Sequence, residues 1–413
     1  DPNYSLCRAT VNCGEDAHTD KKFALDKESA LALSKLFMTP EKDLEDKKIS
    51  DVLPESFWST NFWLYWQTMF AFQRWSSALE MKRYLCRYVH HIDGLPDFSA
   101  LRFTKYNQYE SMILPLVKYL ESHGVTIEYG MDVKNVIIED NGDKKVAKQI
   151  VYVKDGKEQT IDLIEDDLVF ITNGCCTDTS CYGDQTHAPD ISNVRDGVGE
   201  SWDLWKNIAR QAKNGEYGNP DKFCNDFEAT NWMSATVATS DEKVIRHIMD
   251  ICKRDPRAGK VTTGGIVTVK DSTDNWYLSW TINRQPQFRA QDKNTVLVWV
   301  YALNTNKEGN YVKKAMRDWA KKSAANGFII SAFRQTKLTS SQRMPAIQRP
   351  ASCRSSTHSS SREKKRTVRL LFLTELSTSH SSVSSRKLRE IRYSPRNILS
   401  VPVWKRSILC SML

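Results

Sequence analysis

Cysteine thiols are the first candidates for chemistry in this sequence, because a thiolate can bind a metal or act as a nucleophile. The closest group is Cys175, Cys176 and Cys181, with Cys224 farther along the chain. A structural zinc site more often shows two CxxC-like pairs, and these cysteines lack that spacing. Ten cysteines without a signal sequence instead favour reduced thiols in a cytosolic protein. We predict free thiols and no metal.

A buried strand that ends in a tight turn is the second pattern of interest. The sequence DDLVFITNG, residues 166–174, reads as such a strand and ends in Asn173 and Gly174. In two-part dinucleotide folds the final strand meets the cofactor at the carboxyl edge of the sheet. An ordinary α/β domain with a meander is the alternative. The Gly-Val-Gly run at residues 197–199 lacks the third glycine of a G-x-G-x-x-G motif.

Helices must position these residues. Residues 27–37 have the apolar spacing of an amphipathic helix. Residues 57–91 are apolar on almost every face as far as Phe72, which predicts a long aromatic helix in the interior of the protein. Further helices are predicted for residues 105–124, 202–212 and 241–252.

Strands are predicted in two groups. Residues 125–129 and 133–139 alternate in polarity, and the pairs Asn141-Gly142 and Asp155-Gly156 are hairpin turn signals before and after a further strand. The second group comprises residues 261–272, 276–284 and 295–303. In this group Gly264-Gly265 permits close approach of the backbone, although a plain turn is the simpler interpretation.

Charge divides the chain near Lys322. Residues 323–413 contain 17 Lys or Arg, three acids and 20 serines, a net charge of +14. The whole chain carries +9, so residues 1–322 carry −5. Eleven of the twelve tryptophans lie in the acidic part, which is long enough to bury a core. The basic part has neither helical nor strand periodicity and predicts a disordered segment.

We expect an α/β protein in four segments. They are residues 1–104, a helical substrate or lid region; 105–175, the second half of a dinucleotide-binding domain; 176–320, a substrate region with a mixed sheet; and 321–413, a basic disordered tail. The chain begins with Asp1 and shows no signal peptide, so we expect a truncated or processed N-terminus. No apolar stretch reaches the roughly 18–20 residues that span a bilayer.

Several long segments resemble one family. They are DPNYSLCRATVN at residues 1–12, STNFWLYWQTMFAFQRW at 59–75, HHIDGLPDFSALRFTKYNQYES at 90–111, GNPDKFC at 218–224 and TINRQPQF at 281–288. In this order they resemble oleate hydratases, formerly called myosin-cross-reactive antigens. Members are bacterial flavoproteins that add water across a cis double bond of a free fatty acid. The resemblance extends to about Asp318.

The resemblance assigns the catalytic proton donor to Tyr84. Family members carry this tyrosine in a segment like MKRYLCRY. A phenol can protonate an alkene carbon if its anion is stabilised in a dry pocket. Without the resemblance, the pattern favours a core tyrosine with a satisfied hydroxyl.

The resemblance also implies substrate-binding residues. Gln108 would face the active site, while Thr281 and Asn283 would help to hold the fatty-acid carboxylate. Gln287 would contact the head group as well; it stands where many members have histidine, and its side chain donates a hydrogen bond but does not titrate. From the residues alone, Thr281 and Asn283 are simply alternate positions on one strand face.

FAD is the cofactor that the resemblance implies. It would act by organising the active site and its electrostatics. The expected fold is an FAD-binding, two-part Rossmann-like fold, incomplete in this chain, with Asn173 and Gly174 as cofactor contacts. The glycine-rich turn and the water-activating glutamate of the family are expected upstream of Asp1. We therefore expect this chain to be weakly active or inactive.

A change of reading frame is our hypothesis for the tail. Residues 391–406 match what the family segment TVFTTEYSVRTGMEAV encodes when it is read one nucleotide late, and residues 377–386 match NFAFIGQFAE in the same way. We place the slip between Asp318 and Ser323. The nucleotide sequence tests this hypothesis.

The leading functional hypothesis is therefore a fatty-acid hydratase fragment. The alternatives are a lipid-binding or membrane-surface protein without catalysis, and another flavin-dependent fatty-acid enzyme such as an isomerase. We expect an unsaturated free fatty acid as the substrate and no nucleic acid as a partner. A homodimer, and a cytoplasmic location with peripheral contact at the inner face of the membrane, are compatible with this sequence.

Overall fold

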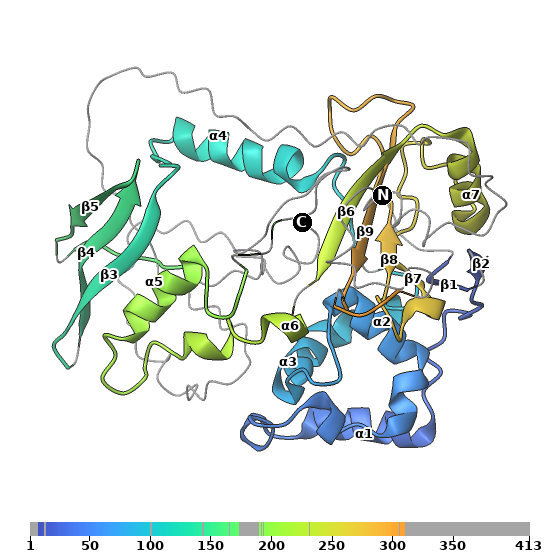
Figure 1. The fold of residues 1–413 in the computed structure, drawn as a ribbon, viewed down its shortest axis with the longest axis horizontal. Coiled ribbons are helices and arrows are strands. Elements are labelled where there is room, and N and C mark those ends of the chain that lie inside the picture. The colour runs from blue at the N-terminus through green and yellow to red at the C-terminus, as the bar shows by residue number, and fades with distance from the viewer. Residues whose placement is uncertain are drawn as a thin grey trace.

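A six-stranded and a three-stranded sheet organise the described part of the chain. The computed structural model describes residues 7–11, 14–99, 101–142, 144–164, 166–172, 190, 192, 194–230, 232–304 and 306–309. Figure 1 shows the two sheets at opposite ends of the molecule, with helix α4 (Leu114–Ser122) between them. The predicted combination of helices and sheets is confirmed.

The six-stranded sheet has the order β2-β1-β7-β8-β9-β6. Its strands are β1 (Ala9–Val11), β2 (Glu15–Asp16), β6 (Met233–Thr239), β7 (Val267–Val269), β8 (Ser279–Thr281) and β9 (Val296–Ala302). Strand β1 runs parallel to β7, and the other neighbours are antiparallel. Residues from both sides of the predicted boundary at 104 therefore share one sheet.

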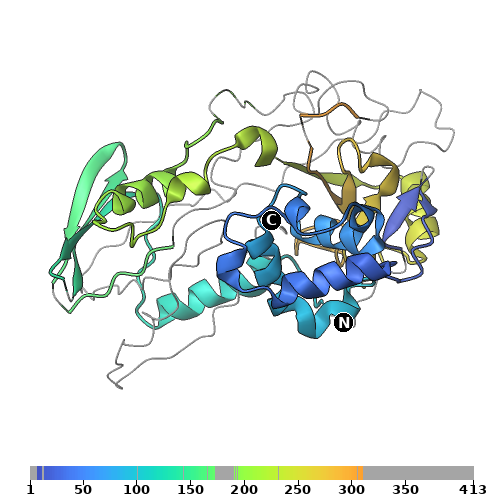
Figure 2. The same cartoon turned by 90° about the horizontal axis from the view of Figure 1, so that it is seen from below.

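Helices cover both faces of this sheet (Figures 1 and 2). On one face lie α1 (Lys27–Met38), α2 (Asn61–Phe70) and α3 (Ala78–Tyr88), whose apolar side chains form one cluster with Ile266 and Tyr301 of the sheet region. On the other face α7 (Glu242–Cys252) packs against β6, β8 and β9. The predicted helices at residues 27–37 and 241–252 are confirmed.

The predicted long aromatic helix is wrong in one respect, because two helices occupy residues 57–91. Helix α2 ends where Ala71 adopts a left-handed conformation (φ +56°), and α3 begins after the N-cap Ser77. Tyr301 Oη donates a hydrogen bond to Thr68 O, which fixes the last turn of α2 to the sheet. A single straight helix could not fold back to bury both apolar faces against one core.

The three-stranded sheet is an antiparallel meander of β3 (Asp132–Asp140), β4 (Lys145–Lys154) and β5 (Lys157–Asp162). The predicted hairpin turns are confirmed: Gly142, Asp155 and Gly156 all have positive φ. Helix α5 (Glu200–Ala209) packs Leu204 and Ile208 against the meander.

Two predicted strands are not formed in the described residues. Residues 125–129 and 166–172 alternate or run apolar in sequence, but they adopt no strand conformation. Val125, Tyr129 and Leu168 are exposed. A strand needs a hydrogen-bonding neighbour, and residue alternation alone does not supply one.

The remaining helical turns are short. They are Glu41–Asp43, Ile49–Asp51, Glu55–Ser59, Val89–Gly94, Tyr109–Ile113, Pro220–Lys222, Phe227–Thr230 and Lys270–Ser272. The π-helical turn Tyr109–Ile113 leads directly into α4, so the helix predicted at residues 105–124 is shorter and starts later. Within the described ranges, no helix is long and apolar enough to cross a membrane.

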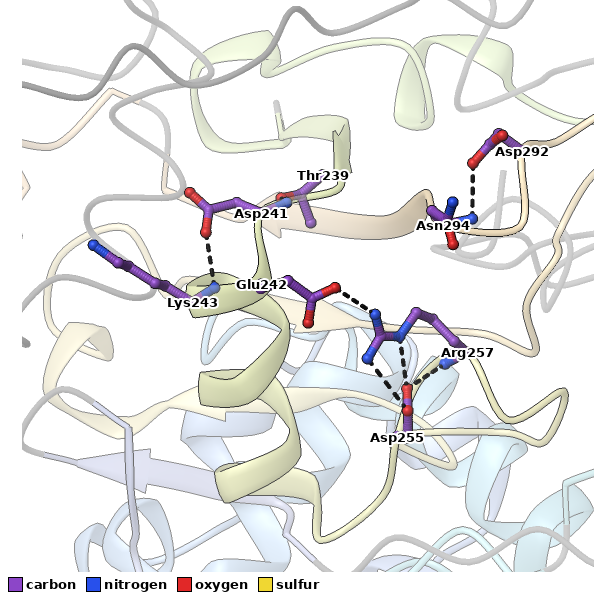
Figure 3. Close-up of polar contacts among 8 residues, drawn as sticks. All are labelled: Thr239, Asp241, Glu242, Lys243, Asp255, Arg257, Asp292 and Asn294. Carbon is purple, nitrogen blue, oxygen red and sulfur yellow. Dashed lines mark hydrogen bonds and ion pairs between the residues drawn. The ribbon is translucent and has the colours of Figure 1, made fainter.

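An arginine anchors the loop that follows α7. Arg257 Nη1 lies 2.6 Å from Glu242 Oε1, and Arg257 Nε lies 3.2 Å from Asp255 Oδ1 (Figure 3). The N-cap of α7 is Asp241, whose carboxylate accepts a hydrogen bond from Lys243 N at 2.8 Å. This loop continues into residues 261–265, which form part of the candidate site.

Candidate functional site

Tyr84 lies on α3, with its ring against an aromatic wall. The ring is edge-on to Phe70, with centroids 5.3 Å apart, and to Phe72, at 5.2 Å. Ser77 caps the helix by accepting a hydrogen bond from Glu80 N at 3.2 Å. The side chain of Tyr84 is only half-buried. Its ring is thus held in a fixed, largely apolar environment.

Two titratable groups on the same helix are perturbed by burial. Glu80, one turn before Tyr84, has its carboxyl pKa raised to about 7 by desolvation. Tyr88, one turn after Tyr84, has its pKa raised to about 12 for the same reason. The rings of Tyr84 and Tyr88 both contact Phe70. This part of α3 therefore disfavours charged forms.

Thr281 is buried in β8 and belongs to a small hydroxyl network. Its Oγ1 donates to Gly265 O at 2.7 Å and lies 2.9 Å from Thr263 Oγ1. A substrate carboxylate would have to compete for this hydroxyl proton with Gly265 O. The network is built by the loop that leads into β7.

The backbone of Gly265 closely approaches the ring of Phe98, as the absence of a side chain at this position permits. A Cβ at this position would lie 2.0 Å from Phe98 Cδ2. Phe98 itself has φ +58°, an unusual conformation for a bulky residue. The aromatic ring therefore lies directly on the backbone that anchors Thr281.

Asn283 and Gln287 follow Thr281 in an extended turn. Asn283 is half-buried, and its backbone O accepts from Gln285 Nε2 at 3.1 Å. Among the described residues its side-chain amide makes no hydrogen bond, so the amide is free to bind a ligand. Gln287 N donates to Gln291 Oε1 at 2.7 Å. These bonds hold the turn through the backbone.

Asn107 joins this turn to the segment that carries Gln108. Its backbone N and its Nδ2 both donate to Gln287 O, at 2.7 and 3.0 Å. Glu110 reinforces the link, because its Oε2 accepts from Asn107 Nδ2 at 2.9 Å and from Arg289 N at 3.0 Å. The structure thus joins the backbone beside Gln108 to Gln287, although the two glutamines lie 179 positions apart in sequence. Gln108 Oε1 is buried and has no hydrogen-bond partner in the described part of the chain.

The predicted cofactor contacts Asn173 and Gly174 lie outside the described residues, as do Cys175, Cys176 and Cys181. Cys224 is a free thiol, in agreement with the prediction. No cluster of three or more metal-binding side chains occurs within the described ranges.

Arg8 is a buried cation near Thr281 that sequence reasoning did not single out. It is 3% exposed, and its guanidinium stacks on Phe98 with 3.8 Å between Cζ and the ring centroid. Burial lowers its pKa to about 10, so it stays charged at neutral pH. The only signal in the sequence was a charged residue between the apolar Cys7 and Ala9.

Comparisons with known proteins identify the family to which the chain belongs. Residues 1–325 match the MCRA family, and the chain belongs to that family. It is 43% identical over 319 residues to an oleate hydratase of Streptococcus pyogenes serotype M49 (strain NZ131), covering 77% of this chain and 53% of the relative. It is 33% identical over 313 residues to a linoleate hydratase of Lactiplantibacillus plantarum, covering 71% and 52%. The chain spans about half the length of these curated relatives.

Proposed function

We propose that this chain is part of a hydro-lyase that adds water to the cis double bond of an unsaturated free fatty acid. The observation that carries the proposal is the placement of Tyr84 against Phe70 and Phe72 in a protein 43% identical to an oleate hydratase. An apolar wall suits a fatty-acid chain, and it excludes water from the alkene until the proton is transferred.

The proposed reaction uses the residues of the site as follows. Tyr84 gives its phenolic proton to one alkene carbon, water adds to the other carbon, and the surplus proton of that water restores the phenol. Thr281 and Asn283 hold the substrate carboxylate, and Gln287 and Gln108 line the same region. Their hydroxyl and amide groups are neutral donors from which a carboxylate can accept hydrogen bonds.

FAD belongs to the proposal through the family resemblance alone. A dinucleotide pyrophosphate requires a glycine-rich turn at the end of a parallel strand. The described residues of this region form an antiparallel meander instead, without such a turn. The described part therefore does not by itself fit FAD, and no step above passes through the flavin. We propose that the two-part dinucleotide fold and the flavin belong to the longer protein.

Incubation with oleate tests the proposal. The protein that carries this chain within the full length of its relatives should convert oleate to 10-hydroxystearate, with a mass increase of one water by mass spectrometry. The Tyr84→Phe variant is the matched control and should form far less product. Absence of product from the unaltered, FAD-loaded protein would contradict the assignment.

A second candidate is contact with a lipid surface, favoured by one exposed apolar helical face. Met112, Ile113, Leu116 and Tyr119 follow the i, i+3, i+4 spacing and are 41–56% exposed. The same face could instead pair two copies in a homodimer. Co-sedimentation with anionic vesicles and sedimentation velocity separate the two outcomes, with Leu116→Lys as the disrupting variant. A cytoplasmic protein with peripheral membrane contact fits the first outcome.

A further inference from the structure

Arg8 is a cation buried among aromatic rings. Its guanidinium carbon lies 3.8 Å from the centroid of Phe98 and 4.8 Å from that of Tyr65. Such contacts stabilise the flat faces of a guanidinium but leave its edge donors unused. A buried arginine normally has a carboxylate or another acceptor for these donors.

The donors of Arg8 are only partly used. Nη1 donates to Ile266 O. Nε and Nη2 are buried, and neither has a hydrogen-bond partner in the part of the chain that the structure describes. These two nitrogens form one side of the planar guanidinium, and their N–H groups are nearly parallel. That fork matches the two oxygens of a carboxylate.

The protein groups that interact most strongly with Arg8 do not neutralise it. They are Tyr65, Tyr301, Tyr88 and Cys7. Burial raises the pKa of all four groups, to about 12 for Tyr88 and Cys7, so they are uncharged at neutral pH. None of these four described groups therefore neutralises the positive charge of Arg8.

Arg8 lies next to the predicted carboxylate site. Ile266 O, which accepts from Arg8, belongs to the residue that follows Gly265, and Gly265 O accepts from Thr281 Oγ1. Phe98 contacts both Arg8 and Gly265. The Arg8 guanidinium and the Thr281 hydroxyl thus donate hydrogen bonds to the backbone carbonyls of two consecutive residues, Ile266 and Gly265.

We propose that Nε and Nη2 of Arg8 bind the carboxylate of the fatty-acid substrate as a bidentate pair. This inference rests on the proposed function and adds a charged ligand to the neutral donors Thr281 and Asn283. Because the fork is buried, the aromatic side chains around it must move as the carboxylate enters. Arg8 would then select acids over uncharged lipids of the same chain length.

Equilibrium dialysis with two ligands tests this role. Oleate and oleyl alcohol share the hydrocarbon chain and differ at the head group, and both are used below their aggregation limits. The unaltered protein should bind oleate more tightly. Arg8→Gln should weaken oleate binding about 10- to 100-fold and leave alcohol binding unchanged, because a charged hydrogen-bonded pair is lost. Arg210→Gln, an exposed arginine at the end of α5, is the matched control.

The outcomes are separable. Arg8→Lys keeps the charge without the fork and should recover only part of the oleate preference. If Arg8→Gln fails to fold, the oleate preference of Arg8→Lys tests the inference in its place. An unchanged preference for oleate in a folded Arg8 variant, with a lowered melting temperature, would show that Arg8 serves the fold alone and would overturn the inference. If the unaltered protein binds and hydrates oleate in the same experiment, the unchanged preference of the variant overturns the inference about Arg8 and leaves the proposed function standing. If it binds neither ligand, the proposed function fails with it.

Discussion

The ring of Phe98 occupies the space that a side chain at Gly265 would need. A Cβ on Gly265 would lie 2.0 Å from Phe98 Cδ2 and 2.3 Å from Cε2. This contact joins the segment after α3 to the loop before β7, and it holds Gly265 O in place to accept from Thr281. Gly265 is therefore needed both for packing against Phe98 and for the hydrogen bond that positions Thr281.

Substitution of Gly265 should be strongly destabilising. Gly265→Ala should lower the free energy of unfolding by about 3 kcal/mol, the upper part of the range for overpacked sites, because Phe98 has to leave its position. Urea denaturation measures the change. Phe98→Leu should cost less in the Gly265→Ala background than in the unaltered protein.

A glycine in open space is the control for this prediction. Gly130 has φ +70°, and a Cβ added there would meet no atom of the described residues within 4 Å. Gly130→Ala should therefore cost only about 1 kcal/mol, for its backbone conformation. If the effects of Gly265→Ala and Phe98→Leu simply add, the steric interpretation is wrong.

Removal of one hydroxyl should separate catalysis from folding at Tyr84. Tyr84→Phe keeps the ring contacts with Phe70 and Phe72, so the melting temperature should change little. Loss of the proton donor should lower kcat for oleate hydration about 10²- to 10⁴-fold. Tyr129→Phe makes the same chemical change at an exposed tyrosine and should leave the rate unchanged. Equal rates for Tyr84→Phe and the unaltered protein would exclude Tyr84 as the acid.

The buried carboxyl of Glu80 should make stability depend on pH. Burial raises its pKa from 4.5 to about 7, so the folded state favours the protonated form. Its contribution is fully present below pH 4.5 and is lost as the pH rises through 7. Glu80→Gln should therefore match the unaltered protein below about pH 4 and be more stable by about 1–3 kcal/mol at pH 8. Urea melts across this range, with the exposed Glu158→Gln as control, check the prediction; a constant difference at all pH values would refute it.

Arg257 should contribute modestly to stability through the loop after α7. Arg257→Met removes contacts with Glu242 and Asp255 and should cost about 1 kcal/mol, less at high salt, because the pairs are partly exposed. Arg246→Met alters an exposed arginine on α7 and should cost less. Thermal melts at low and high salt measure both variants. A salt-independent loss at Arg257 would point to packing of its side chain instead of charge.

Local chemistry in the sequence determined the helices and turns that the structure confirms. The apolar spacing of residues 27–37 and the polar-to-apolar pattern of residues 241–252 predict helices that form almost at those bounds. The pairs Asn141-Gly142 and Asp155-Gly156 place the hairpin turns, because residues with positive φ are encoded by residue type. The family resemblance, carried by whole segments, identified the family that the comparisons confirm.

Only the tertiary structure decided which of these elements share a core and which side chains meet. Parallel pairing of β1 with β7 links residues about 260 positions apart, and no local pattern specifies such a neighbour. The break between α2 and α3 depends on how both helices pack against the sheet, so the apolar run of residues 57–72 could not reveal it. The stacking of Arg8 on Phe98, and of Phe98 on Gly265, likewise arises from three distant segments. Periodicity and turn residues act over a few positions, whereas burial and charge pairing depend on the folded chain.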